Sequence, residues 1–196
     1  NNPLAIINGR AQLLRDHVDT EDGRKPVEII IEQANRASDI VSDLMEFATP
    51  VKPQREIVDL KETLERVARE HTESGQPDAG KVDVELAEDT ATVYCDPQQL
   101  TAAMNELFDN AVDACDAGKA HIVVKTVAED DGKHVQIRVA DNGRGMNAEV
   151  LGKALDPFFS AQPAGRKRGM GLSNVFRNIQ ANNGTLWLES EPDKGT

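Results

Sequence analysis

Two apolar stripes at the start of the chain constrain its fold more than any other feature. Within residues 1–48, apolar residues recur at alternating intervals of three and four positions, which is the spacing of a helical bundle or a coiled coil. Residues 19–23 are polar, end in glycine and predict a turn, and Pro26 is expected in the first turn of the second helix. The stripes consist of Leu4, Ile7, Ala11, Leu14 and Val18, and of Val27, Ile30, Ala34, Ala37, Val41, Leu44 and Ala48.

More apolar side chains occur here than one helical hairpin can bury. The residues that flank the stripes are Ile6, Leu13, Ile31, Ile40 and Met45. We therefore expect two hairpins to pair as a dimeric four-helix bundle. A hairpin that packs against its own second domain is the alternative. Residues 49–53 contain two prolines, which end the helix. They predict a boundary between a first domain over residues 1–53 and a second domain over residues 54–196.

The remaining sequence predicts an α+β domain. We expect helices after Asp59, from Asp96-Pro97 to about Ala117, near 148–154 and near 172–181. We expect strands over 81–86, 90–94, 120–127, 133–140 and 185–190. Because strands and helices mix without a regular alternation, this pattern favours an α/β sandwich that follows the helical hairpin.

The charge balance restricts the ligands that the chain can bind. Lys and Arg total 22 and Asp and Glu total 34, so the net charge is 22 − 34 = −12. An acidic chain is a poor partner for nucleic acid or for an anionic membrane surface. No apolar run reaches about 18 residues, so we expect a cytoplasmic segment without membrane contact, with anchoring of the full-length protein left open. Two cysteines, Cys95 and Cys115, are too few for a disulfide framework or a zinc site.

The helix expected after Asp96 carries the first polar motif. Glu106 and Asn110 are four residues apart, so they lie on one helical face. A carboxylate and an amide oxygen on one face are able to hold Mg²⁺ and to orient or deprotonate an attacking group. Taken alone, this spacing is more often a solvated polar face, and that alternative stays open.

Two glycine motifs follow it. Residues 141–146 come after a strand, and Asp141 is able to accept a hydrogen bond from an adenine amino group, although Asp-Asn-Gly is also a common turn. Residues 165–172 come before a helix, whose N-terminus favours a phosphate group. Their basic side chains, at 166–168, place sparse positive charge where a triphosphate would arrive, although a flexible solvated loop is the alternative.

The order of these segments resembles the ATP-binding fold shared by gyrase, MutL and histidine kinases. In that resemblance the polar helix is the N box, and the two glycine motifs are the G1 and G2 boxes. Residues 155–160, Leu-Asp-Pro-Phe-Phe-Ser, resemble the F box of histidine kinases, and Gly195-Thr196 matches the last glycine-threonine of the fold. The resemblance covers roughly residues 57–196.

The first residues of the chain indicate one branch of that fold. Residues 1–7 resemble the segment after the phospho-accepting histidine of sensor kinases, and Asn2 and Pro3 match the end of its His-Glu-x-x-(Asn/Thr)-Pro pattern. The expected histidine would stand three residues before Asn1, outside this sequence. Three other histidines are expected at the surface: His71, His121 and His134.

The resemblance implies ATP and Mg²⁺ as cofactors and assigns roles to single residues. Asn110 would coordinate Mg²⁺, Asp141 would read the adenine amino group, and Glu106 would take a proton from the attacking group or position it. Asn2 would orient water for dephosphorylation of a regulator, with helix capping as the alternative. The other expected nucleotide-binding residues are Gly143, Gly145, Met146, Arg168, Gly169, Met170, Gly171, Leu172 and Thr196.

The resemblance also implies a sensor histidine kinase core with two partners. The γ-phosphoryl group of ATP would pass to the upstream histidine and then to an aspartate of a response-regulator receiver domain. The hairpin would form a homodimer, and no nucleic acid would bind.

Two other functions remain open at this point. A gyrase- or MutL-type ATPase would use Glu106 to hydrolyse ATP with water, although the heptad hairpin and the F box count against it. A nucleotide-binding dimerisation scaffold without transfer activity agrees with the missing histidine. Phosphate transfer from labelled ATP would separate these functions.

Overall fold

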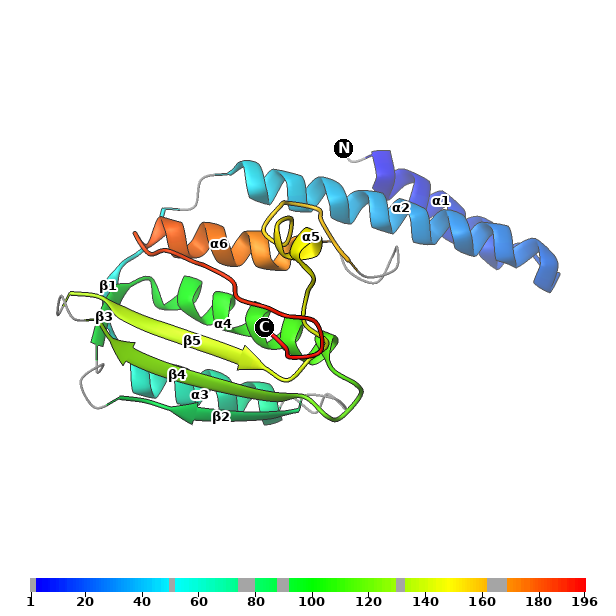
Figure 1. Cartoon of the computed structure of the whole chain (residues 1–196). Helices are drawn as coiled ribbons and strands as arrows, with labels where there is room; N and C mark the ends of the chain where they lie inside the picture. Colours follow the sequence, from blue (N-terminus) through cyan, green and yellow to red (C-terminus); the bar gives the residue numbers. More distant parts are fainter. Residues whose placement is uncertain (1–2, 50–51, 74–79, 88–91, 130–132, 162–168) are drawn as a thin grey trace. The chain divides into compact units, whose positions relative to one another are not determined.

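The structure is a computed structural model that describes residues 3–49, 52–73, 80–87, 92–129, 133–161 and 169–196 (Figure 1). The chain divides into two compact units, Asn1–Pro50 and Val51–Thr196. The first is helical throughout its described residues apart from a short turn, and the second combines helices with two β-sheets. Within the described ranges, no helix is both long and apolar enough to cross a membrane.

The first unit is a hairpin of α1 (Pro3–Asp16) and α2 (Glu21–Ala48). The hydroxyl of Thr20 accepts a hydrogen bond from the backbone N–H of Gly23 at 3.3 Å, and this bond starts α2. The helix therefore begins earlier than the sequence predicts, and Pro26 lies inside α2 rather than in its first turn. The acidic first turn favours this early start, because negative side chains are stabilising at a helix N-terminus.

The hairpin buries the small members of the apolar stripes and leaves many large ones exposed. Ala11, Val27 and Ala34 are buried between the two helices. By contrast, many large stripe residues and their neighbours are about half exposed: Ile6, Ile7, Leu13, Leu14, Ile30, Ile40, Val41, Leu44 and Met45. One hairpin therefore leaves a large apolar surface uncovered, as the sequence predicts.

The second unit contains a two-stranded and a three-stranded sheet. In the first, β1 (Glu56–Asp59) pairs antiparallel with β3 (Thr92–Cys95). In the second, the strand order is β2 (Lys81–Glu85), β4 (His121–Ala128) and β5 (Val135–Asp141), with β2 parallel and β5 antiparallel to β4. The helices are α3 (Leu60–Glu73), α4 (Pro97–Ala114), α5 (Ala148–Leu151) and α6 (Gly171–Ala181).

The layers of this unit place α4 at its centre. Helices α3 and α4 pack on the three-stranded sheet, and α6 packs on α4 (Figure 1). The most deeply buried large side chains between these layers are Leu60, Leu64, Val67, Phe108, Ile122 and Val124. The expected helical hairpin followed by an α/β sandwich is confirmed.

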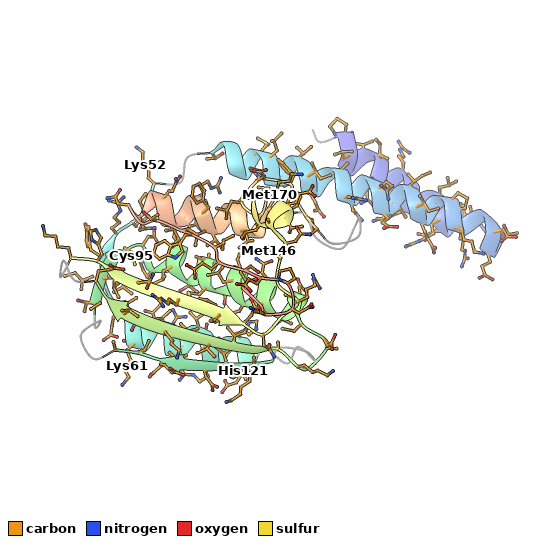
Figure 2. The ribbon with its side chains drawn as sticks, in the orientation of Figure 1. Lys52, Lys61, Cys95, His121, Met146 and Met170 are labelled. Carbon is orange, nitrogen blue, oxygen red and sulfur yellow. The ribbon has the colours of Figure 1, made fainter. Side chains whose placement is uncertain are left out.

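One surface prediction is wrong. His71 is 7% exposed, and its ring contacts Phe108 edge-on with 5.3 Å between the ring centroids. The reason is its position on α3, because it continues the apolar spacing of Leu60, Leu64 and Val67 by four more residues. His121, at the start of β4 (Figure 2), and His134 are exposed, as expected.

Two strand predictions also need correction. β1 is absent from the expected elements, because four residues before a helix give too short a pattern to recognise. Residues 185–190 form no strand, although Leu186 and Leu188 are partly buried and Trp187 is half exposed. Side-chain alternation reports which residues face the core, and it does not reveal whether a hydrogen-bonding neighbour is available. The structure has an isolated bridge at Glu191 and Gly195 instead.

Asp96 fixes the N-terminus of α4, as the sequence predicts. Its carboxylate accepts hydrogen bonds from the backbone N–H groups of Gln98 (2.9 Å) and Gln99 (3.1 Å), and also of Gln54 (2.7 Å). Burial opposes the charge, but these three donors hold the pKa of Asp96 below its usual value. The cap therefore contributes most while the carboxylate is ionised.

We expect Asp96→Ala to lower the free energy of unfolding by about 1–2 kcal/mol, the range for a lost N-cap. Asp59→Ala is the matched control, because the carboxylate of Asp59 accepts one backbone donor, from Glu62, and should cost less. The lowered pKa means that the stabilisation is present above the unfolded-state pKa and is lost as the pH falls through the folded-state pKa. Urea unfolding at neutral and acidic pH measures both effects. An Asp96→Ala deficit that does not shrink in acid contradicts this assignment.

Candidate functional site

The first part of the site is the contact between α4 and the start of α6. Glu106 and Asn110 lie one turn apart on α4. Gly171 lies against both, because a Cβ atom at this glycine would stand 2.6 Å from Glu106 Oε2 and 3.2 Å from Asn110 Nδ2. A larger residue would displace the carboxylate of Glu106 or crowd the carboxamide of Asn110. The fold therefore brings the first and the third sequence motifs together.

The carboxamide of Asn110 has an unused hydrogen-bonding group. Its Nδ2 atom is buried and finds no partner among the described residues. Such a group costs about 1–3 kcal/mol, so its presence at this contact calls for an explanation. Because a carboxamide can turn by half a rotation, the position can offer either an oxygen to a cation or an N–H to a phosphate oxygen.

These residues fit a magnesium ion that arrives with a phosphate ligand. In the parts of the chain that the structure describes, no group of three His, Cys, Asp or Glu side chains could hold a metal ion. Mg²⁺ is commonly bound by one or two protein oxygens together with substrate phosphates and water. Asn110 supplies one such oxygen and the Glu106 carboxylate lies one turn away, whereas a cation held by the protein alone would need more ligands.

The second part of the site lies at the end of β5. The carboxylate of Asp141 accepts a hydrogen bond from the backbone N–H of Gly143 at 2.8 Å, and its own backbone N–H donates to the carbonyl of Thr196 at 3.0 Å. Burial raises the pKa of Asp141, and the backbone N–H groups of Gly143 and Thr196 oppose this rise only in part. A half-buried carboxylate with remaining acceptor capacity suits a ligand that donates an N–H.

Two glycines let the C-terminal segment approach Asp141 closely. Gly145 (φ 62°) lies against the carbonyl of Glu191, and Gly195 (φ 85°) lies against the carbonyl of Asp141. A Cβ atom at either glycine would overlap these carbonyl groups, and the positive φ angles favour glycine as well. The strand end and the C-terminal segment are therefore in direct backbone contact.

Ser190 joins the same two segments, and the sequence did not identify it. Its hydroxyl accepts a hydrogen bond from the backbone N–H of Met146 at 2.8 Å and donates to the carbonyl of Gly195 at 2.8 Å. It also lies 3.1 Å from the hydroxyl of Thr196. A serine at the end of an alternating segment has no distinctive sequence signal, so its role becomes visible only in the fold.

Asn142 has more contacts than a simple turn requires. Its Oδ1 accepts hydrogen bonds from the backbone N–H of His121 (2.8 Å) and from Cys115 Sγ (3.2 Å), and its Nδ2 donates to the carbonyl of Lys119 (3.1 Å). Arg144 donates to a carbonyl in the last turn of α4 at 3.1 Å. The G1 motif is therefore anchored to the end of the helix that carries the N-box residues.

The G2 motif is described from Gly169 onward. Gly169 (φ 71°) packs on the backbone of Phe159, where a Cβ atom would stand 2.5 Å from the carbonyl oxygen. Met170 is buried (Figure 2), and its carbonyl accepts a hydrogen bond from the hydroxyl of Ser173 at 2.8 Å. Leu172 is half-buried. These contacts hold the first turn of α6, whose leading N–H groups have no partner within the helix.

Some expected site residues lie outside the described residues. These are Asn2 and Arg168, together with Arg166 and Lys167 of the basic segment. Their expected roles stay predictions. The structure thus brings Gly171 of α6 against Glu106 and Asn110 of α4. It also places Asp141 beside Thr196, and the neighbouring Gly143 and Arg144 contact the last turn of α4.

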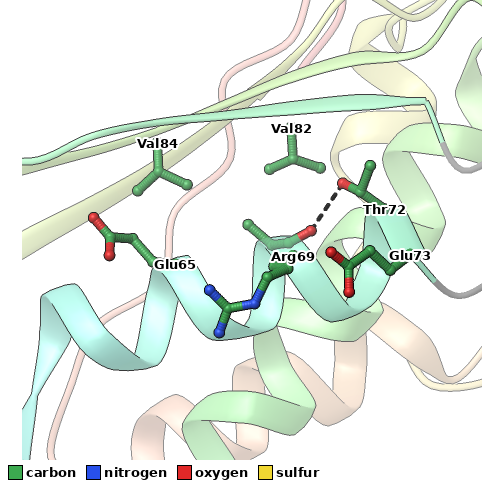
Figure 3. A pocket seen from close by; sticks show the side chains of 7 residues that line it. Glu65, Arg69, Thr72, Glu73, Val82 and Val84 are labelled. Atoms are coloured by element: carbon green, nitrogen blue, oxygen red, sulfur yellow. Dashed lines mark hydrogen bonds between the residues drawn. The ribbon is translucent and has the colours of Figure 1, made fainter.

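A separate pocket of about 290 Å³ lies between α3 and β2 (Figure 3). Figure 3 shows Val82 and Val84 above the helix, while the hydroxyl of Thr72 donates to the carbonyl of Ala68 at 2.9 Å. The remaining lining residues are Glu65, Arg69 and Glu73. None of the expected site residues lines this pocket, so pocket volume alone does not identify the candidate site.

Two family models match the chain. The model described as "Histidine kinase-, DNA gyrase B-, and HSP90-like ATPase" matches residues 95–196, which is more than half of the chain. The model described as "His Kinase A (phospho-acceptor) domain" matches residues 1–51. The two matches follow the order in which the hairpin and the sandwich occur.

Curated relatives match over the whole chain but are much longer. Sensor histidine kinase ZraS of Klebsiella oxytoca is 28% identical over 195 residues, which cover 99% of this chain and 41% of the relative. Sporulation kinase E of Bacillus subtilis (strain 168) is 27% identical over 200 residues, which cover 100% of this chain and 26% of the relative. The chain therefore spans less than half the length of these relatives.

Solved structures share the fold. Full-length ShkA in complex with AMPPNP has a TM-score of 0.70 at 22% identity, covering 98% of this chain and 41% of that chain. Histidine kinase ThkA in complex with the response regulator protein TrrA has a TM-score of 0.68 at 22% identity, covering 99% of this chain and 55% of that chain. These likenesses include both units of the chain.

We expect Asp141→Asn to raise the unfolding temperature of the ligand-free chain at neutral pH. Burial raises the folded-state pKa of Asp141. The protonated side chain therefore contributes its full stability below the unfolded-state pKa, and this contribution is lost as the pH rises through the folded-state pKa. A neutral amide of the same shape avoids that loss, and the difference from wild type should shrink in acid. Thermal unfolding across this pH range measures it.

Asp116→Asn is the matched control, because it removes the same charge from an exposed side chain that pairs with Lys119. It should leave the unfolding temperature nearly unchanged, since exposed ion pairs contribute little. An Asp141→Asn variant that is less stable than wild type at neutral pH would show that the carboxylate is a net stabiliser.

Proposed function

Because the chain belongs to the histidine kinase-, DNA gyrase B- and HSP90-like ATPase family, we propose that it is the catalytic core of a two-component sensor histidine kinase. It transfers the γ-phosphoryl group of ATP to a histidine just upstream of Asn1, and then to an aspartate of a response-regulator receiver domain. The observation that carries this proposal is the convergence of Gly171 on Glu106 and Asn110, in a chain whose first residues match a phospho-acceptor domain.

In the proposed nucleotide site, α4 and α6 hold the phosphate end of ATP. Asn110 is the magnesium ligand through its carboxamide oxygen, and its buried unpartnered Nδ2 is able to donate to a phosphate oxygen. When bound, Mg²⁺ neutralises phosphate charge. The N-terminus of α6, with Gly169, Met170, Gly171 and Leu172, adds backbone N–H groups and a positive helix end to the same region, and Arg168 lies next to them in sequence.

The adenine end of the proposed site lies at the end of β5. Asp141 accepts a hydrogen bond from the adenine amino group, which its half-buried carboxylate supports. Gly143, Gly145 and Met146 line the base, and Thr196 lies beside Asp141 through the backbone hydrogen bond between them. The close backbone packing at Gly145 supports a narrow site of this kind.

In the proposed reaction, Glu106 is the protein side chain that acts on the attacking group. Its carboxylate lies within one helical turn of Asn110 and beside the first residue of α6. We assign it to take a proton from the attacking group or to position that group. Positioning and charge neutralisation supply most of the remaining rate enhancement in phosphoryl transfer, which demands little covalent chemistry from the protein.

The hairpin provides the proposed dimer and regulator contacts. Its half-exposed isoleucine, leucine and valine side chains support pairing with a second hairpin, because a four-helix bundle buries such surfaces. In this proposal Asn2 orients water during dephosphorylation of the regulator. Because ATP is the phosphoryl donor, we place this part of the protein in the cytoplasm.

Labelled ATP tests the proposed reaction. A chain extended upstream to include the expected histidine, incubated with ATP labelled at the γ-phosphate, should acquire label that acid removes and base does not. Phosphohistidine has this behaviour, and replacement of the upstream histidine by glutamine is the control that should abolish labelling. Release of free phosphate without labelled protein would identify an ATPase instead, and absence of both would identify a nucleotide-binding scaffold.

Two substitutions separate binding from transfer in the same extended chain. Asn110→Ala should weaken binding of Mg-ATP by roughly 10-fold or more, because loss of a charged-ligand contact costs about 1.5–3 kcal/mol. Glu106→Gln should retain nucleotide binding and reduce the transfer rate by about 10²-fold, the lower end for a lost general base. Calorimetric titration measures the first effect and label incorporation the second. Unchanged affinity in Asn110→Ala or undiminished transfer in Glu106→Gln contradicts the corresponding role.

A further inference from the structure

A polar network surrounds the N-terminus of α4, and the proposed mechanism does not use it. Its centre is Asp96, which is 6% exposed and accepts backbone hydrogen bonds from Gln54, Gln98 and Gln99. Gln99 is 7% exposed. Buried polar groups at a helix end need partners, so the side chains around them are constrained in position.

Asn182 connects this network to the end of α6. Its Oδ1 accepts a hydrogen bond from the backbone N–H of Asp96 at 2.8 Å. Its Nδ2 donates to Gln99 Oε1 at 2.8 Å and to the carbonyl of Asn178 in the last turn of α6 at 2.8 Å. One carboxamide therefore bonds to both helices, and two of its three bonds satisfy groups of the α4 end, the backbone N–H of Asp96 and the side-chain oxygen of Gln99.

Arg55 connects the same helix end to the segment before β1. Its Nη2 donates to the carbonyl of Ala181 and to Asn183 Oδ1, the latter at 3.1 Å. A cation beside the last carbonyls of a helix is favourable, because the C-terminus carries partial negative charge. Arg55 and Gln54 follow residues 49–53 directly in the chain, so the network joins α4, α6 and the start of the second unit.

The two helices run antiparallel with a polar contact at each end. The start of α6 lies against Glu106 and Asn110, and its end lies against Asp96 and Gln99. The eleven residues of α6 separate these contacts by about 16 Å at 1.5 Å per residue. A rigid helix held at one end has less freedom to shift or rotate at the other.

We propose that Asn182 and Arg55 are positioning residues for nucleotide binding. They hold the C-terminal end of α6 on α4 and on residues 54–55, and they thereby fix Gly171 against Glu106 and Asn110 at the opposite end of the helix. The proposal rests on the proposed function, because the Gly171 contact is the phosphate end of the nucleotide site. It predicts that a substitution in the network weakens nucleotide binding, although no residue that touches ATP is changed.

Binding of AMPPNP with Mg²⁺ to the 196-residue chain tests the proposal. Asn182→Ala leaves the Asp96 N–H and Gln99 Oε1 without a partner, and the dissociation constant should rise by roughly 2- to 30-fold, the range for coupling through a packed network. Arg55→Met should weaken binding by a smaller factor, and Arg55→Lys should restore much of it by keeping a positive donor at the helix end.

Val67→Ala is the control for a general loss of stability. Val67 is fully buried in α3 and belongs to neither the network nor the site. It should lower the unfolding temperature while AMPPNP binds as in wild type. Wild-type affinity in both Asn182→Ala and Arg55→Met overturns the proposal, and so does an equal loss of affinity in Val67→Ala.

Hydrogen exchange separates a failure of this proposal from a failure of the proposed function. In the nucleotide-free chain, amide exchange over residues 171–175 should be faster in Asn182→Ala than in wild type, and Val67→Ala should not reproduce this change. If wild-type protein does not bind AMPPNP, the proposed function fails, while faster exchange still supports the positioning role. Unchanged exchange in Asn182→Ala overturns the positioning role whatever the nucleotide result.

Discussion

The contact of Gly171 with Glu106 and Asn110 is the constraint on which the candidate site depends. It allows α6 to approach α4 without a side chain between them, and it leaves polar atoms of α4 facing the start of α6. The opposite end of the same helix pair is closed by the bonds of Asn182. Helix α4 therefore has two functions, as the packing partner of the sheet and as the support of the candidate site.

The sequence predicts the elements and motifs that depend on local chemistry. Asp96 caps α4 and Asp59 caps α3, as the residue order indicates, and the apolar spacing of α3 locates its buried face. The grouping of the three box segments follows from a resemblance to a known fold, because nothing local to Glu106 or Gly171 predicts that they meet. The contact between them is a property of the tertiary structure.

Other features could not be predicted, for identifiable physical reasons. Ser190 and Asn182 act through bonds to distant backbone groups, and a serine or an asparagine in a polar segment gives no sign of its partner. His71 is buried because its helical position outweighs its polarity. The segment 185–190 alternates like a strand, yet it lacks the neighbour that a ladder requires. Prediction from the sequence fails where the burial, the hydrogen bonds or the strand pairing of a residue depend on neighbours that are distant in the sequence.

The half-buried carboxylate of Asp141 has a consequence for how the stability of the folded chain depends on the nucleotide concentration. Its charge is unfavourable in the folded chain, since burial raises its pKa, and a ligand that donates an N–H compensates for part of the lost hydration. A ligand that binds the folded chain and not the unfolded chain adds about 2.7 kcal/mol of stability when its concentration is a hundred times its dissociation constant. In the proposed kinase, adenine nucleotide would therefore stabilise the folded chain, and depletion of ATP would lower its stability together with its activity.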